Sequence, residues 1–209
     1  MSFLAHSTSA TPGRASGARW IVVPIAVLLL SSCGGRFASP AAVIDGRELP
    51  VETLQEELDL LLRQPGFARE ERKDLTRRLL AFLIHVEVVR EYGGANGISV
   101  SNEEVDLELQ RAVEQTGGPD AFEQQLEAQG LTLPGVRRTI ERNLLFGKVR
   151  DAVAEERLDG TSAGDQQKDA AFQEWLLDRL TTGDIQVNPR FGRLNPSNGA
   201  VEAIRSTEG

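Results

Sequence analysis

The stretch at residues 69–92, REERKDLTRRLLAFLIHVEVVREY, predicts a long helix with a broad apolar surface. Apolar residues recur along it at helical spacing, and a second set lies beside the first. The first stripe comprises Leu75, Leu79, Phe82, Leu83, Val86 and Val89, and Leu80, Ile84 and Val88 widen it. Because apolar residues cover so much of its circumference, we expect the helix to be contacted on more than one side. Gly93-Gly94 is expected to end it.

Outward from this helix, the sequence predicts a small hairpin before it and further helices after it. Residues 41–49, AAVIDGREL, have the pattern of a strand, an Asp45-Gly46 turn and a return strand. Ser101 and Glu104 fit a capping box that opens a helix. Further amphipathic segments precede and follow it, and residues 184–187 have the pattern of a short strand. The expected fold is all-α, with about six helices and a minor β element formed by the N-terminal hairpin and a C-terminal strand.

Composition narrows the class of protein. The 209 residues are 40% hydrophobic, which suits one globular domain. The net charge is −8, and an acidic surface repels phosphate backbones, so we expect no nucleic-acid partner. Cys33 is the single cysteine in the sequence, which excludes an intramolecular disulfide.

The first 32 residues have the pattern of an export signal. They contain Arg14 and Arg19 and no acidic residue, followed by the apolar run WIVVPIAVLLL at residues 20–30. This run is shorter than the roughly 20 apolar residues that span a bilayer, and its basic flank is typical of a signal peptide. The run leads into Leu30-Ser-Ser-Cys33, which resembles a bacterial lipobox, where a signal peptidase cuts before a lipidated cysteine. The alternative is a plain secretory signal followed by a chance cysteine.

The sequence therefore predicts a lipoprotein signal peptide at residues 1–32 and a lipidated Cys33, followed by a tether at residues 33–40. A diacylglyceryl group with a further acyl chain such as palmitate exceeds the single chain that gives only marginal membrane binding. We expect an extracytoplasmic protein held at the cell membrane by this lipid.

Motifs for enzyme chemistry are missing from the sequence. It has no GxxxxGK[ST] phosphate loop, no GxGxxG after a strand and no GxSxG. His85 lies within the most apolar helix, where a hydrogen-bonded histidine beside the core is the favoured interpretation over a catalytic one. Adjacent carboxylates, such as Glu103-Glu104, fall at helix starts and on polar faces. We expect no catalytic residue, no metal site and no cofactor.

Three blocks together resemble the N-terminal domain of SurA- and PrsA-type extracytoplasmic chaperones. Residues 42–62 are similar to the family's small V-x-N/D-G strand and the helix after it. Residues 97–111, GISVSNEEVDLELQR, match its G-[IV]-x-[VI]-[ST]-x-x-[DE]-[VI] segment, and residues 122–149 match its F-x-x-x-L-x-x-x-G-[LM]-[ST] segment and the basic amphipathic helix that follows. Residues 172–192 resemble the C-terminal helix and strand that close the same domain.

In that family a parvulin-type prolyl isomerase is inserted before the closing helix. Here the insertion point is reduced to a linker at residues 159–168, too short for a parvulin domain, and the parvulin histidines are missing. The resemblance implies a SurA N-terminal-like domain at residues 41–192, in which the helix around Phe172 and Trp175 packs back on the N-terminal helices. Residues 193–209 are expected to be a flexible tail.

The resemblance implies ATP-independent holding of unfolded or nascent exported polypeptides, without isomerase activity. Two other functions stay open: a lipid-anchored scaffold with one dedicated partner, and a minimal prolyl isomerase. A holding protein needs an apolar groove, and the candidates for surplus exposure are Leu80, Ile84, Val88 and Trp175, although core is the default interpretation for each.

Overall fold

The computed structural model describes residues 39–64, 72–158 and 164–204. The predicted signal peptide, Cys33, most of the tether and residues 159–163 of the linker lie outside this part of the chain. Residues 37–209 form one compact unit.

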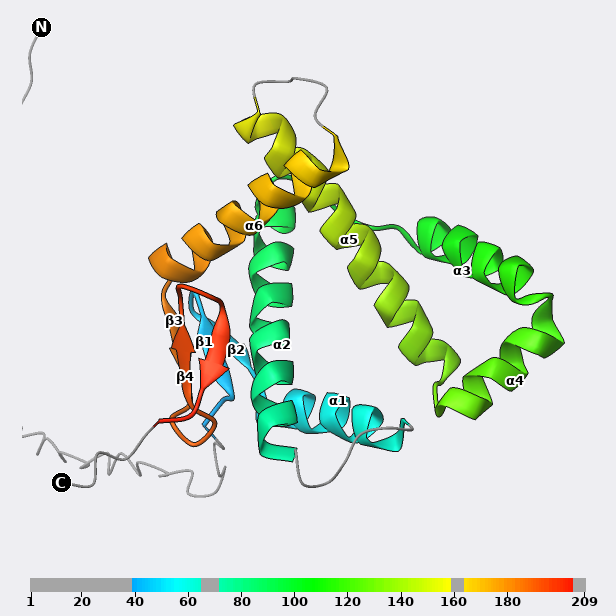
Figure 1. Ribbon diagram of the computed structural model, residues 1–209, viewed down its shortest axis with the longest axis horizontal. Helices are drawn as coiled ribbons and strands as arrows, with labels where there is room; N and C mark the ends of the chain where they lie inside the picture. The colour runs from blue at the N-terminus through cyan, green and yellow to red at the C-terminus, as the bar shows by residue number, and fades with distance from the viewer. Residues whose placement is uncertain (1–38, 65–71, 159–163, 205–209) are drawn as a thin grey trace, which may run out of the picture. The chain divides into compact units, whose positions relative to one another are not determined.

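Helix α2 (Arg72–Ala95) is the central element of the unit. It contacts α1 (Val51–Arg63), α5 (Leu133–Arg157), α6 (Asp165–Thr182), β1 (Ala42–Ile44) and β5 (Ala200–Glu202) (Figure 1). Its fully buried residues include Leu80, Ile84, Val88 and Val89. Contact on more than one side is thereby confirmed, and the physical reason is the apolar surface that α2 presents to all these neighbours.

The N-terminal hairpin is present as predicted and becomes part of a larger sheet. Strand β1 pairs antiparallel with β2 (Arg47–Leu49) through the Asp45-Gly46 turn, where both residues have positive φ, at 46° and 81°. This is the backbone that a two-residue hairpin turn requires. The predicted C-terminal strand, β3 (Ile185–Val187), pairs antiparallel with the other edge of β1. The sheet order is therefore β2-β1-β3, which joins the two ends of the domain.

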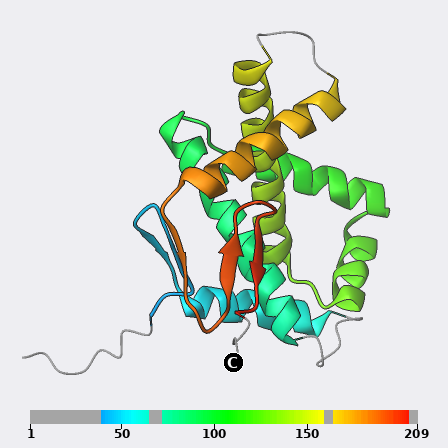
Figure 2. The same ribbon diagram turned by 60° about the vertical axis from the view of Figure 1, so that its left-hand side comes forward.

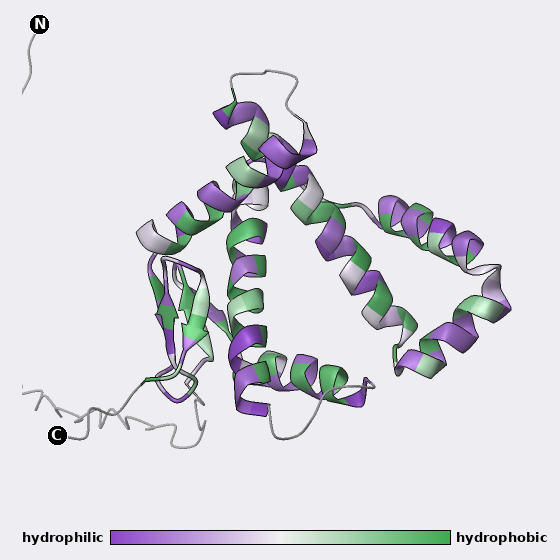
Figure 3. Ribbon diagram, in the orientation of Figure 1, coloured by the Kyte–Doolittle hydropathy of each residue, from purple (hydrophilic) through white to green (hydrophobic). Residues whose placement is uncertain are grey.

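Helices α3 (Asn102–Thr116) and α4 (Pro119–Gln129) form an arm that packs on α5 through α3. The predicted capping box opens α3, because Ser101 Oγ accepts from Glu104 N–H and the Glu104 carboxylate accepts from Ser101 N–H. Lys148 of α5 donates to the same carboxylate, and its ammonium group holds the pKa of Glu104 below its ordinary value. Along α3 and α4 hydrophobic and hydrophilic residues alternate (Figure 3), and Val105 is the one buried residue of these two helices.

Helix α6 folds back over α5 and α2, as the sequence predicts. Trp175 of α6 lies edge-on to Tyr92 of α2 with 4.9 Å between the ring centroids, and Phe172 stacks on Trp175. The linker is shorter than expected because residues 165–168 already belong to α6, whose Gly164 N–H donates to Gln167. Residues 158–164 alone separate α5 from α6.

The expectation of a flexible tail at residues 193–209 is wrong for its first twelve residues. Strands β4 (Arg193–Asn195) and β5 form an antiparallel hairpin, and β5 lies against α2 in Figures 1 and 2. Val201 is buried in the main core, and His85 of α2 hydrogen-bonds the Gly199 carbonyl at 3.0 Å. The polar, turn-rich composition gives little indication of this hairpin, because Val201 is its one buried residue in the strands and Leu194 is only partly buried against the core.

Gly93 does not end α2 as expected, since the helix continues to Ala95. A Cβ at Gly93 would lie 3.1 Å from the Ile98 carbonyl oxygen and 3.2 Å from Leu145 of α5. The glycine therefore allows close approach of α5 to α2. A helix-ending glycine and a glycine at a helix contact look alike in sequence.

Gly192 is expected to be essential for the hairpin. Its φ is 138°, and a Cβ there would lie 2.2 Å from the Glu202 carbonyl oxygen. Gly192→Ala should lower the free energy of unfolding in urea by about 2–4 kcal/mol through strain and displacement of β5. Gly94→Ala is the matched control, because a Cβ in that helical position meets nothing within 4 Å and should stabilise by up to about 1 kcal/mol. Equal unfolding midpoints for the two variants would contradict this account.

Candidate functional site

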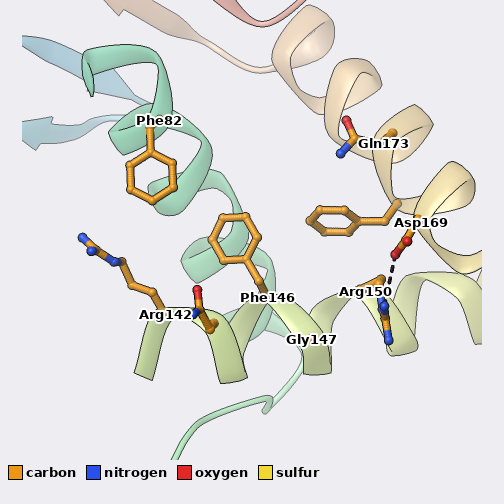
Figure 4. A pocket seen from close by; sticks show the side chains of 9 residues that line it. Phe82, Arg142, Phe146, Gly147, Arg150, Asp169 and Gln173 are labelled. Carbon is orange, nitrogen blue, oxygen red and sulfur yellow. Dashed lines mark hydrogen bonds and ion pairs between the residues drawn. The ribbon is translucent and has the colours of Figure 1, made fainter. Parts of the chain in front are cut away.

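An apolar hollow of about 430 Å³ lies where α2, α5 and α6 meet. Three aromatic rings line it, one from each helix: Phe82 from α2, Phe146 from α5 and Phe172 from α6. The Phe82 and Phe146 rings project into the space between their helices (Figure 4). Phe82 is 42% exposed, which is high for a phenylalanine in the middle of the central helix.

A second hollow of about 320 Å³ lies between α1 and the N-terminal half of α5. Leu60 and Leu61 line it from α1, and Val136 and Ile140 line it from α5. Arg142 lines both hollows, so the two meet at its side chain. We call the joint feature the α5 groove, defined by Leu60, Leu61, Phe82, Val136, Ile140, Arg142, Phe146 and Phe172.

Arginines of α5 form the charged rim of this groove. The Arg142 guanidinium lies 5.3 Å from the centroid of the Phe82 ring and 3.7 Å from Glu57 of α1. Further along, Arg150 donates to Asp169 of α6 at 3.1 Å, and this hydrogen bond raises the Arg150 pKa above its ordinary value (Figure 4). The groove thus combines apolar walls, which gain by burial against another apolar surface, with fixed cations able to donate to carbonyl or carboxylate oxygens.

The four residues predicted to line a client groove do not line it. Leu80 and Ile84 have no exposed surface, Val88 is 1% exposed, and Trp175 is 5% exposed. They are core residues because α5, α6 and the β1–β2 and β4–β5 hairpins cover α2 on the side that carries Leu80, Ile84 and Val88 as well. Cys33, the predicted lipidation site, lies outside the described residues.

Periodicity alone does not distinguish groove-lining residues such as Phe82, Val136 and Ile140 from core residues. Phe82 belongs to the same stripe as Leu75 and Leu79, which are buried. Val136 and Ile140 line the groove from the N-terminal half of α5 and are only half-buried, whereas Val149 and Val153 of the C-terminal half are buried. Periodicity gives the direction in which a side chain points. It does not tell whether a neighbouring element covers that level of the helix.

His85 is a structural residue, as its position in the sequence indicated. Its Nε2 donates to the Gly199 carbonyl, and burial lowers its pKa below the ordinary value of 6.5. Among the residues that the structure describes, no three His, Cys, Asp or Glu side chains gather into a metal-binding group. In the same part of the chain no helix has the length and apolarity needed to cross a bilayer.

Comparison with protein families identifies the class of domain. The model of the SurA-like N-terminal domain matches residues 18–150, more than half of the chain, and no parvulin domain is matched. The chain belongs to the SurA-like N-terminal domain family, which is a chaperone-type family. A search of curated proteins returned no significant match.

The buried histidine predicts a pH dependence of stability. Because the folded-state pKa of His85 is lowered, the unfolded chain binds a proton more readily, and stability falls as the pH drops below 6.5. Wild type should therefore lose more free energy of unfolding between about pH 7.5 and about pH 5.5 than His85→Gln, whose amide can still donate to Gly199 but does not titrate. Urea unfolding at the two pH values measures this, and an equal loss in both proteins would exclude His85 as the cause.

Proposed function

We propose that this protein is a lipid-anchored, extracytoplasmic chaperone that holds unfolded or nascent exported polypeptides without ATP and without prolyl isomerase activity. Membership of a chaperone-type domain family supports the general class. The predicted export signal at residues 1–32, followed by Cys33, supports the location and the anchor. The holding activity itself is inferred from the α5 groove.

The observation that carries the proposal is an apolar groove left uncovered in an otherwise closed fold. Half-buried apolar side chains at Leu61, Val136, Ile140 and Phe146 line it together with the exposed Phe82 ring. Exposed apolar surface of this kind marks sites that meet a partner. Apolar burial is non-directional, so such a groove accepts segments of different sequence. Its limited area makes binding weak and reversible, as a holding protein requires.

The connection between α5 and α6 supports holding over isomerisation. Only residues 158–164 separate the two helices, and no catalytic domain fits between them. Holding an unfolded chain needs no nucleophile, no proton transfer and no nucleotide. That matches a sequence without a phosphate loop and with one histidine beyond the predicted signal peptide.

Suppression of aggregation tests the proposed function directly. The form that begins at Gly34 should slow the aggregation of a chemically unfolded model protein, measured by light scattering. Phe82→Ser should weaken client binding by about 1 kcal/mol, so roughly fivefold more protein is needed for the same effect. Leu107→Ser is the matched control, because Leu107 of α3 is 51% exposed but does not line the groove.

Two results would count against this function. If several-fold excess of wild type leaves aggregation unchanged, the alternative of a scaffold with one dedicated partner is favoured. If Leu107→Ser impairs holding as much as Phe82→Ser, the α5 groove is not the client site.

The lipid anchor is tested separately in cells that export the chain. Wild type should fractionate with membranes and should incorporate a labelled fatty acid such as palmitate. Cys33→Ser should lose the label and, after a high-salt wash that removes electrostatic binding, should move to the soluble extracytoplasmic fraction, because Cys33 is the single cysteine in the sequence. A Cys33→Ser protein that is cleaved normally and still stays with salt-washed membranes would contradict the proposed anchor.

A further inference from the structure

Four cationic side chains line one hollow at the start of α2. Arg72, Lys73 and Arg77 come from the first turns of that helix, and Arg190 comes from the connection between β3 and β4. The hollow measures about 410 Å³, and none of the described residues that line it is acidic. In Figure 3 the start of α2 is its hydrophilic end. The net charge of the protein is −8, so this cluster of positive charge is opposite in sign to the protein as a whole. We call this surface the basic patch, defined by Arg72, Lys73, Arg77 and Arg190.

The charges of the basic patch are available to a partner. Within the described residues, Lys73 and Arg190 have no ion-pair partner, and Arg190 lies 4.4 Å over the Phe191 ring. Arg72 is paired with Asp59 at 3.6 Å, but both side chains are more than half exposed, and exposed pairs of this kind are weak. Arg77 is paired with Asp74, which does not line the hollow. The patch therefore keeps an excess of positive charge.

Apolar residues accompany these cations. Phe191 and Ile204 line the same hollow, and Ile204 is 56% exposed. Cations beside exposed apolar side chains are typical of surfaces that lie in the headgroup region of a bilayer, where the charges meet phosphates and the apolar groups enter the acyl boundary.

The chain enters the domain next to the basic patch. The Asn188 backbone N–H donates to the Ala41 carbonyl at 3.0 Å, and its side-chain amide donates to the Pro40 carbonyl at 3.1 Å. Asn188 immediately precedes Pro189 and Arg190, which line the hollow. From Cys33 to this point the chain has only residues 34–39, which can span at most about 20 Å. A lipid on Cys33 would hold this side of the domain within reach of the membrane.

We propose that the basic patch binds the anionic phospholipid surface of the membrane in which the chain is anchored. The expected closeness of the patch to the membrane rests on the proposed lipid anchor at Cys33. The positive charge of the patch does not depend on that anchor. Binding there provides a second attachment besides the lipid. It also orients the domain, because the rest of an acidic protein is repelled by an anionic surface.

Vesicle sedimentation of the unlipidated form beginning at Gly34 tests the patch without the anchor. This form keeps the whole compact unit of residues 37–209. It should bind phosphatidylcholine vesicles that contain phosphatidylglycerol and not vesicles of phosphatidylcholine alone, and binding should weaken as salt is raised. Each cation near such a surface contributes about fivefold to partitioning, so Lys73→Gln combined with Arg190→Gln should reduce it about 25-fold.

The matched control removes the same charge elsewhere. Arg111→Gln combined with Arg137→Gln makes the identical change in net charge on α3 and α5, away from the basic patch, and should leave partitioning within about twofold of wild type. Urea unfolding of each variant confirms that it is folded, and the salt dependence of wild-type binding is an independent readout if a variant is not.

Equal binding to both vesicle types, or an equal loss in the control variant, would overturn the proposal. Binding of an acidic polypeptide without vesicle binding would also overturn it and assign the patch to clients. Failure of the aggregation assay leaves the vesicle result untouched, because the α5 groove and the basic patch share no residue.

Discussion

The burial of α2 is the interaction on which the rest of the structure depends. Leu80, Ile84, Val88 and Val89 are removed almost completely from water, and no single neighbour could cover them all. Three helices and two short strands therefore surround α2, although none of the strands exceeds three residues and none would be stable alone. The hydrophobic effect acts here on one helix and thereby gathers segments from both ends of the chain. In return, α2 helps to position each of these neighbours.

Much of the fold follows from local sequence signals, because those signals describe local chemistry. The Asp45-Gly46 turn, the Ser101–Glu104 capping box and the six amphipathic segments are each read from a few adjacent residues, and all are present. The β4–β5 hairpin was missed because its attachment to α2 is distant in sequence, through Val201 and the His85–Gly199 hydrogen bond. The candidate site was misplaced for a related reason. Which apolar side chains stay uncovered depends on where neighbouring helices end, and periodicity carries no such information.

The α5 groove is best understood as a difference between two halves of one helix. The C-terminal half of α5 buries Val149 and Val153 against neighbouring helices, whereas Val136 and Ile140, on the groove-lining face of the N-terminal half, stay half-buried. The arm of α3 and α4 packs on another side of α5 and leaves this face open. The N-terminal half of α5 thus exposes apolar surface, while its C-terminal half is packed in the core. The exposed part can therefore bind a partner without weakening the core.

The order of strands in the three-stranded sheet has a consequence for the route of folding. The hydrogen bond between Asp45 and Asp184 joins residues 139 positions apart, and β1 sits between an immediate neighbour and a strand from the far end of the domain. A chain that emerges from its N-terminus first can complete the β1–β2 hairpin early, but it must wait for almost its whole length before β3 closes the sheet. Until then one edge of β1 and one side of α2 stay exposed. A chain that lacks β3 therefore carries an unpaired strand edge and an uncovered apolar helix surface, two features that promote aggregation.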